Sequence, residues 1–180
     1  NGLHSHMGSG IHDYKNWSKT LAKLIEYIQY FDTLEWIDIG GGIGIDKEID
    51  FNSLDIDINL VKPPNVQIFM EPGRFIVAQS GVLIGKVTQI KQKKGIKFIG
   101  TNIGMTDLIR PALYNAIHPI YFHFNDKRKE NKQIVNVVGP ICESGDVLIK
   151  NLIVDYDIKE GDTIVVENTG AYGYSMSSDY

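Results

Sequence analysis

Apolar residues recur at helical spacing near the start of the chain. In the stretch from residue 14 to residue 31 they fall three or four positions apart, and they are Trp17, Leu21, Leu24, Ile25, Ile28 and Phe31. An apolar stripe of this period predicts an amphipathic helix over residues 14–31. Asp13 or Asn16 is its expected N-cap, because short polar side chains bond the free N–H groups at a helix start.

Two short apolar runs nearby predict buried strands instead. Residues 34–39 form the first run, which leads into a glycine-rich turn, and residues 66–70 form the second. Strands that alternate with helices in this way favour βα units around a parallel sheet. We therefore expect an α/β arrangement in the first part of the chain.

The pattern changes near residue 82, where β-type runs replace the helical period. The predicted strands are residues 82–92, 96–102, 120–124, 134–138, 147–149 and 163–166. A turn at residues 93–95 and a charged connection at residues 125–132 separate some of them. This half is expected to be mostly antiparallel β, so the predicted domains are residues 1–81 and 82–180.

Composition narrows the class of protein. The 180 residues are 43% hydrophobic and 22% charged, with a net charge of −4, as in a soluble globular protein. An acidic chain offers no basic face to nucleic acid, and the apolar runs are far shorter than the ~20 residues of a membrane span. The single cysteine, Cys142, excludes an internal disulfide and favours a reduced, cytoplasmic setting.

The ends of the chain indicate a piece of a longer protein. It begins at Asn1 without an initiator methionine, and it stops soon after a glycine-rich turn. Natural termini are usually polar and loosely held, which leaves a complete small protein as the alternative.

A run of glycines follows the first predicted strand. Gly40, Gly41, Gly42 and Gly44 come directly after Asp38 and Ile39, and consecutive glycines let backbone N–H groups converge on one anion. The spacing does not match the dinucleotide-binding fingerprint. The run predicts either a phosphate cradle or a tight turn that only needs small residues.

The second predicted strand ends in Glu71-Pro72-Gly73-Arg74. At the carboxyl end of a barrel strand, an acid and an arginine three residues apart can face one ligand; a surface ion pair is the alternative. His4 and His6 lie two residues apart, which in a strand places them on one side. This spacing suits zinc, but no third ligand is evident nearby, so no metal site is predicted.

Two further segments carry reactive groups. Cys142 stands beside Glu143, and Tyr172 lies in a turn between Gly170 and Gly173. A buried structural cysteine and a packed tyrosine are the alternatives to a role in chemistry.

Taken in order, these segments resemble the successive motifs of the fold-type III pyridoxal-phosphate-dependent decarboxylases. The resemblance rests on residues 4–9, 40–42, 71–74, 109–114, 142–146 and 170–173. The forms Arg-Pro-Ala-Leu-Tyr and Cys-Glu-Ser-Gly-Asp favour the diaminopimelate decarboxylases over the ornithine and arginine types. Residues 139–148 are most similar to the decarboxylase half of bifunctional aspartokinase–diaminopimelate decarboxylases.

The resemblance implies a fold and an assembly. The family has a (β/α)₈ barrel followed by a β-rich domain, and it forms homodimers with shared active sites. A whole barrel takes about 250 residues. Residues 1–81 are therefore expected to supply only later strands of a cofactor-binding barrel, and residues 82–180 a truncated C-terminal β domain.

The resemblance also implies a pyridoxal 5'-phosphate site. The phosphate would be held by small residues, namely Ser9, Gly40, Gly41, Gly42 and Gly73. His6 would stack on the pyridine ring as a catalytic residue, and Glu71 would bond the ring nitrogen. Arg74 and Tyr172 would also contact the cofactor.

The implied substrate site combines cationic and acidic side chains. Arg74, Arg110 and Tyr114 would bind a distal carboxylate, which a planar guanidinium meets with two hydrogen bonds. Glu143 would bind the distal ammonium group, and Cys142 would return a proton after decarboxylation. Cys142 and Glu143 would reach into the partner subunit's site, and Tyr172 would touch both substrate and cofactor.

The implied activity is decarboxylation of meso-2,6-diaminopimelate to L-lysine. An ornithine- or arginine-type decarboxylase and a non-catalytic relative are the alternatives. The family's cofactor lysine lies upstream of His4, and no lysine here stands in a matching motif. Residues 1–180 alone are therefore expected to be inactive. They are also expected to be poorly soluble, because a partial barrel leaves unpaired sheet edges and exposed apolar faces. A second departure is Asn102, where relatives usually carry aspartate.

Overall fold

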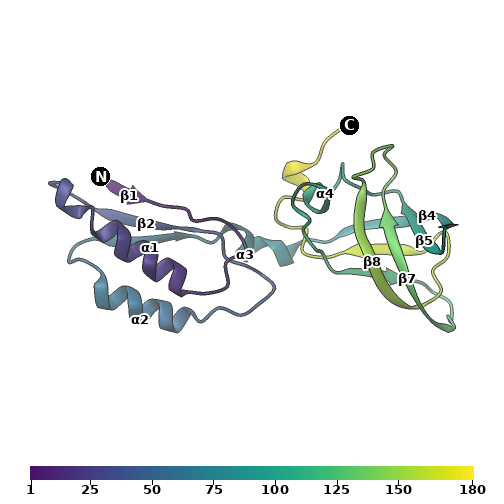
Figure 1. Ribbon diagram of the computed structural model, residues 1–180, viewed down its shortest axis with the longest axis horizontal. Coiled ribbons are helices and arrows are strands. Elements are labelled where there is room, and N and C mark those ends of the chain that lie inside the picture. Colours follow the sequence, from purple (N-terminus) through teal and green to yellow (C-terminus); the bar gives the residue numbers. More distant parts are fainter. The chain divides into compact units, whose positions relative to one another are not determined.

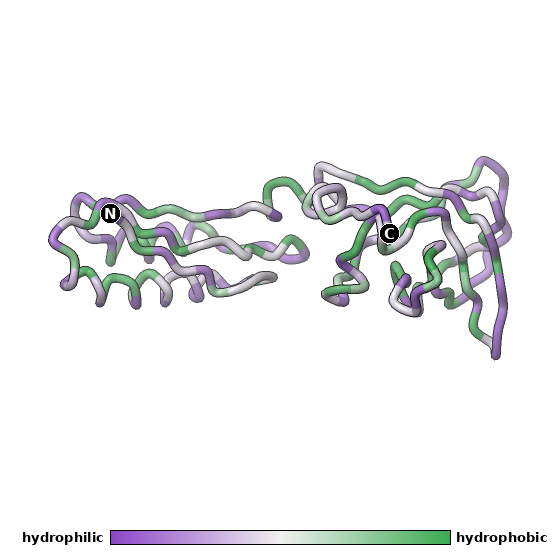
Figure 2. The backbone as a smooth tube through the Cα atoms, turned by 90° about the horizontal axis from the view of Figure 1, so that it is seen from above, coloured by the Kyte–Doolittle hydropathy of each residue, from purple (hydrophilic) through white to green (hydrophobic).

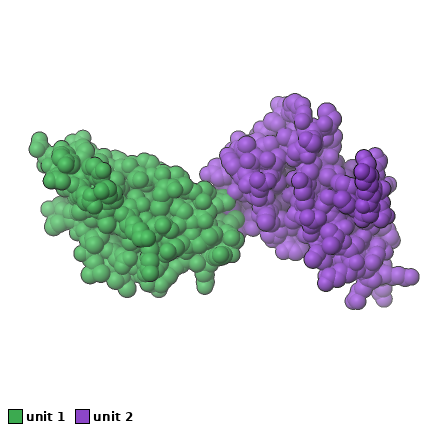
Figure 3. All heavy atoms as spheres, viewed as in Figure 1, with its two compact units in different colours: residues 1–76 green, residues 77–180 purple.

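The computed structural model describes residues 1–180 as two units, residues 1–76 and 77–180, which Figure 3 colours separately. Each unit has an apolar core of its own. Hydrophobic positions alternate with hydrophilic ones along both units (Figure 2). None of the helices combines the length and the apolar character that crossing a membrane requires.

The first unit is built on a parallel sheet. Its three strands are β1 (Gly2–His4), β2 (Trp36–Gly41) and β3 (Gln67–Glu71), with β2 in the centre. Both neighbouring pairs are parallel, as the alternation of strands and helices predicted. The carboxyl ends of the strands therefore meet at one edge of the sheet.

Two helices, α1 (Lys15–Ile25) and α2 (Phe51–Val61), form a layer beside this sheet (Figure 1). Ile37 and Ile39 of β2 are fully buried in one cluster with Trp17 and Leu21 of α1. Because strand side chains alternate between faces, Asp38 points to the opposite face. Each of the three strands thus sends one set of side chains into the core and a second set away from the helices.

The helices of this unit differ from the sequence prediction in two ways. The helix expected over residues 14–31 ends at Ile25 and is followed by a 3₁₀ turn at Ile28–Tyr30. Its N-cap is Tyr14, although Asp13 does accept the Lys15 N–H at 3.0 Å. No helix was assigned over α2, because Leu54 to Ile58 alternate apolar and polar residues as a strand does.

Asp50 explains where α2 begins. Its side chain accepts hydrogen bonds from the Ser53 backbone N–H at 2.9 Å and from the Ser53 hydroxyl at 2.6 Å. The Ser53 bonds lower the pKa of the Asp50 carboxyl below its ordinary value. A helix start that is capped in this way overrides the strand-like pattern of the residues after it.

The second unit is a six-stranded sheet with short helical segments. Its strands are β4 (Leu83–Lys93), β5 (Ile96–Thr101), β6 (Ile120–His123), β7 (Glu130–Val138), β8 (Val147–Tyr156) and β9 (Thr163–Val166). Their spatial order is β6-β9-β4-β5-β7-β8. Only β5 and β7 pair in parallel, so the mostly antiparallel expectation is confirmed.

Two strands of this sheet are longer than their apolar runs predicted. β7 starts at Glu130, inside the expected charged connection, and β8 continues to Tyr156. The added residues of the two strands pair with each other, as Glu130 does with Tyr156 and Gln133 with Val154. Pairing between partners distant in sequence extends a strand beyond the apolar run that predicts it.

The remaining segments are short. They are the helices α3 (Gly73–Val77) and α4 (Arg110–Tyr114) and the 3₁₀ helices Ala78–Ser80 and Tyr174–Met176. α4 ends at Asn115, whose φ of 51° is left-handed. Asparagine is among the few non-glycine residues that adopt this conformation readily.

Candidate functional site

The glycine run at the end of β2 is required by its surroundings. Gly40 and Gly42 have φ values of 72° and 84°, which L side chains rarely adopt. A Cβ on Gly41 would lie 2.0 Å from the Glu71 carbonyl oxygen, and one on Gly42 would lie 1.9 Å from that of Gly8. The backbone of the run therefore packs directly against the ends of two neighbouring segments.

Backbone hydrogen bonds join the run to the loop that follows β1. The Ile11 N–H donates to the Gly42 carbonyl, and the Gly44 N–H donates to the Ile11 carbonyl, each at 2.9 Å. The Arg74 guanidinium also donates to the Ser9 hydroxyl at 3.2 Å. Ser9, the glycine run and Arg74 are thus held together within the first unit.

His6 is fixed by the same run. The Gly41 N–H donates to His6 Nδ1 at 3.3 Å, so this nitrogen is the acceptor and the ring carries its hydrogen on Nε2 when it is neutral. β1 ends at His4, and the expected strand face shared by His4 and His6 was wrong. The ring of His6 is exposed, so the planar ring of a ligand can stack on it.

Glu71 lies beside His4 and Asp38. His4 Nε2 and Glu71 Oε2 are 3.2 Å apart, and the ligand atoms of all three residues lie within 4.8 Å of one another. Asp38 also accepts the Gly40 N–H at 2.8 Å. The acid predicted to meet a ring nitrogen is therefore next to the predicted phosphate cradle.

In the second unit, Arg110 is buried in a polar chain of contacts. Its Nη1 donates to His118 Nε2 at 3.0 Å, and His118 Nδ1 lies 2.9 Å from the Glu167 carbonyl oxygen. An arginine only donates, so Nε2 accepts and the Nδ1–H donates to Glu167. Arg110 is 8% exposed and His118 is 2% exposed, while Tyr114 on the same helix is exposed.

The loop before β8 carries Cys142 and Glu143. Cys142 is a free, exposed thiol, so the alternative of a buried structural cysteine is wrong. Glu143 accepts the Tyr180 hydroxyl at 2.7 Å, and this bond raises the pKa of Tyr180. Both reactive side chains point away from the core of the unit.

Asp146 organises that loop. It is 2% exposed and accepts the N–H groups of Met105 and Ile141 at 2.6 and 2.7 Å. A Cβ on Gly104 or Gly139 would lie within 2.4 Å of its carboxylate oxygen. One buried carboxylate therefore ties the loop of Cys142 to the segment after β5.

Tyr172 adopts an unusual backbone conformation. Its φ is 66°, a left-handed value that costs a non-glycine residue of order 1–3 kcal/mol. The segment around it is anchored, since the Gly170 N–H donates to the Ala78 carbonyl at 3.0 Å. The phenol is about half exposed.

Asn102 has a structural contact. Its side-chain oxygen accepts the Lys86 N–H at 2.6 Å, one residue beyond the Val87–Thr101 pair of β4 and β5. Both aspartate and asparagine offer an oxygen acceptor there.

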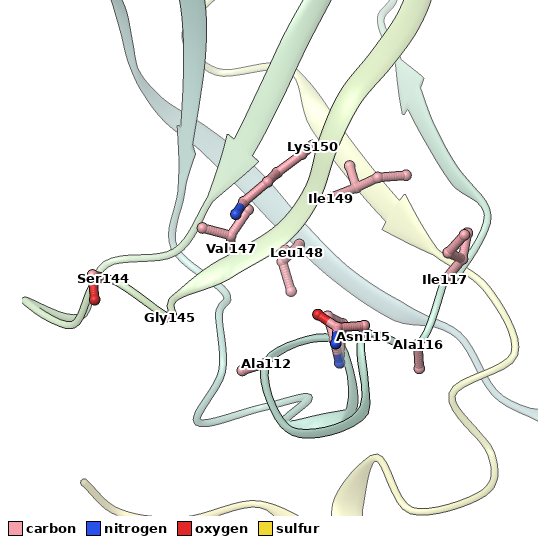
Figure 4. Close-up of a pocket in the computed structure, with 11 residues that line it drawn as sticks. Ala112, Asn115, Ala116, Ile117, Ser144, Gly145, Val147, Leu148, Ile149 and Lys150 are labelled. Atoms are coloured by element: carbon pink, nitrogen blue, oxygen red, sulfur yellow. The ribbon is translucent and has the colours of Figure 1, made fainter.

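A cavity of about 320 Å³ opens between α4 and the start of β8. Figure 4 shows Asn115, Ser144 and Lys150 around it. The neighbours of Arg110 and of Cys142–Glu143 line this cavity, but these three residues do not. The cavity and the predicted substrate residues are therefore distinct parts of the second unit.

Four residues with evident roles in holding the site had no role assigned from sequence: His4, Asp38, His118 and Asp146. Only His118 could have been noticed from sequence, because it is a lone histidine in an otherwise apolar run before Pro119. A histidine in such a place is usually a buried one with satisfied hydrogen bonds. His4 contacts Glu71 across 67 residues of sequence, and Asp146 accepts from Met105 across 41, so a local pattern could not show these contacts.

Comparison with known proteins identifies relatives over the whole chain. Residues 21–170 match the family model of the C-terminal sheet domain of pyridoxal-dependent decarboxylases. Diaminopimelate decarboxylases of Aquifex aeolicus and Escherichia coli K12 are 38% and 36% identical over 99% of this chain, which corresponds to 44% and 48% of their lengths. The chain thus spans about half the length of the curated relatives it matches.

Solved structures agree with this. Diaminopimelate decarboxylase of Helicobacter pylori complexed with L-lysine superimposes with a TM-score of 0.84 at 35% identity, over 99% of this chain and 46% of that one. An arginine decarboxylase of Paramecium bursaria Chlorella virus reaches a TM-score of 0.86 at 20% identity, which shows a common fold alone. The expected fold, later barrel strands followed by a β-rich domain, is confirmed.

Proposed function

We propose a function from the premise that this chain belongs to the family of pyridoxal-dependent decarboxylases. The proposal is that the full-length protein decarboxylates meso-2,6-diaminopimelate to L-lysine with pyridoxal 5'-phosphate. Relatives 34–38% identical over nearly the whole chain are named diaminopimelate decarboxylases. The observation that carries the proposal is the glycine run packed directly against Glu71 in the first unit.

The first unit fits the cofactor. A Cβ on Gly41 or Gly42 would collide with backbone, whereas Gly8 and Gly73 have nothing within 4 Å of where a Cβ would be. A close-packed base with open space beside it suits a phosphate, with the Ser9 hydroxyl and the Arg74 guanidinium as donors next to the run. Glu71 is the acidic partner for a ring nitrogen, and His6 offers an exposed ring.

When bound, the cofactor supplies an electron sink for the electron pair left as CO₂ departs. The protein has to orient the substrate and deliver a proton. Cys142 is exposed and next to Glu143, which supports its proposed role as the group that would give a proton to the reacting carbon. That position is set by Asp146 through the loop.

Recognition of the substrate is assigned to two arginines, two tyrosines and a glutamate. Arg74, Arg110 and Tyr114 bind the distal carboxylate, and Glu143 binds the distal ammonium group. The His118 bond to Arg110 fixes the plane of a buried guanidinium, which favours bidentate contact with a carboxylate. Tyr172 contacts both substrate and cofactor.

We place the active sites in a homodimer, with Cys142 and Glu143 contributed across the interface. Their loop leaves both side chains exposed, as a shared site requires. The cytoplasm is the proposed compartment, since the sole cysteine of this chain is a free thiol.

Measuring CO₂ release from several amino acids tests the function. The full-length protein should act on meso-diaminopimelate and be nearly inert towards lysine and ornithine. These lack the distal carboxylate, so they would lose the contacts proposed for Arg74, Arg110 and Tyr114. Equal rates on ornithine would exclude the assignment, and absence of release from every substrate would favour a non-catalytic relative.

A further inference from the structure

Three side chains meet on the face of the parallel sheet that points away from α1 and α2. His4 is paired in register with Asp38 of β2, and Glu71 ends β3. Their nitrogen and oxygen atoms lie within 4.8 Å of one another. No residue of this group other than Glu71 has a role in the proposed function.

The two carboxylates have different donors. Asp38 accepts the Gly40 N–H at 2.8 Å, which commits it to the glycine run. Glu71 Oε2 lies 3.2 Å from His4 Nε2. A carboxylate only accepts, so His4 Nε2 carries the hydrogen and donates it to Glu71.

This bond is poorly placed to stabilise the fold. The side chains of His4 and Glu71 are 47% and 55% exposed, and exposed pairs of this kind add little to stability. The bond instead restricts the conformation of the Glu71 side chain. A glutamate side chain has three rotatable bonds, and a donor on Oε2 restricts them while Oε1 accepts no hydrogen bond from the protein.

We propose that His4 is a positioning residue for Glu71. Its Nε2–H holds Oε2 so that Oε1 faces the ring nitrogen of pyridoxal 5'-phosphate. The inference rests on the proposed function, because Glu71 has its role only with that cofactor. Preorganisation of a contact group by a fixed neighbour is the general means by which such sites gain affinity and rate.

The test compares four variants of the full-length protein: His4→Ala, His4→Gln, Glu71→Gln and the double variant His4→Ala/Glu71→Gln. Gln keeps a side-chain N–H donor, whereas Ala removes it. His123→Ala is the matched control, because His123 is an exposed strand histidine outside the proposed site. The readouts are the Kd of pyridoxal 5'-phosphate, the absorption spectrum of the bound cofactor and the melting temperature of the apoprotein, all with EDTA present.

His4→Ala should raise the cofactor Kd about 10-fold, the usual effect of losing a hydrogen bond to a charged group. It should also shift the absorption band and leave the apoprotein's melting temperature unchanged. His4→Gln should restore part of both changes, and the double variant should be no weaker than Glu71→Gln.

A wild-type spectrum and Kd for His4→Ala would overturn the inference, and so would additive losses in the double variant. Changes that appear only when zinc is added in place of EDTA would also overturn it, because the three side chains would then be serving as metal ligands. If the wild-type protein binds no pyridoxal 5'-phosphate at all, the proposed function itself fails. The two failures are therefore distinguishable.

Discussion

The two units position their candidate residues by different means. In the first unit, the cradle is made of backbone: glycines that alone fit between Glu71 and Gly8. In the second unit, the reactive side chains are placed by buried polar groups, Asp146 for the loop of Cys142 and His118 for Arg110. A cradle made of backbone can be recognised in the local sequence as a run of glycines. A buried polar residue that holds a loop or a side chain has no such local pattern.

The largest effect should come from the exposed thiol of the second unit. Cys142→Ala in the full-length enzyme should lower kcat by about two to four orders of magnitude, the usual contribution of a positioned acid. The Kd of pyridoxal 5'-phosphate should barely change. Steady-state kinetics and a cofactor titration measure the two quantities.

Mixing variants extends this prediction to the dimer. A Cys142→Ala protein combined with a variant that lacks the cofactor lysine should regain part of the activity, because a mixed dimer contains one site with both residues. Mixed dimers that form but stay inactive would contradict the shared site.

The next effect concerns Asp146, which holds the loop of Cys142, and the quantity expected to change is the free energy of unfolding. Asp146→Ala leaves the N–H groups of Met105 and Ile141 without their acceptor, and this should cost about 2 to 4 kcal/mol. Hydrogen exchange over residues 139–146 should accelerate, as measured by mass spectrometry. Asp155→Ala, which changes an exposed aspartate of β8, is the control and should alter neither quantity.

The smallest effect concerns pH and an ion-pair cluster of the second unit. Bonds from Lys159 and Arg128 lower the pKa of Asp126 from 3.8 to about 2. A lowered folded-state pKa means that the contribution of Asp126 to stability is full above pH 4 and is lost as the pH falls towards 2. Because its side chain is half exposed, the contribution should be small.

Denaturation of wild type and Asp126→Asn at several pH values checks this. The variant should be less stable at pH 7, and the difference should shrink as the pH falls towards 2 and vanish below it. Asp155→Asn should show no such convergence, and a difference that grows in acid would contradict the assigned pKa.

The same contrast explains what the sequence could predict. The parallel sheet, the antiparallel half and the family resemblance followed from periodicity and motifs, and all three are confirmed. The strand-like pattern of Leu54 to Ile58 concealed α2, because its start depends on the Asp50 cap. The stripe ending at Phe31 overextended α1, since spacing alone does not show where a helix stops.

For the site, motif order located the candidate residues but not their supports. His4 and Glu71 are 67 residues apart, and Met105 and Asp146 are 41 apart. Such pairs form only when strands align in register or loops converge. The roles given to the site residues stay predictions until variants are measured.

The central claim is that Glu71 serves the cofactor and Glu143 serves the substrate. Titrating full-length apoprotein with pyridoxal 5'-phosphate tests it directly, with the same substitution made in each unit. Glu71→Gln should raise the Kd about 10-fold and shift the absorption band, whereas Glu143→Gln should leave both as in the wild type. Equal losses from the two variants, or no loss from Glu71→Gln, would contradict this division.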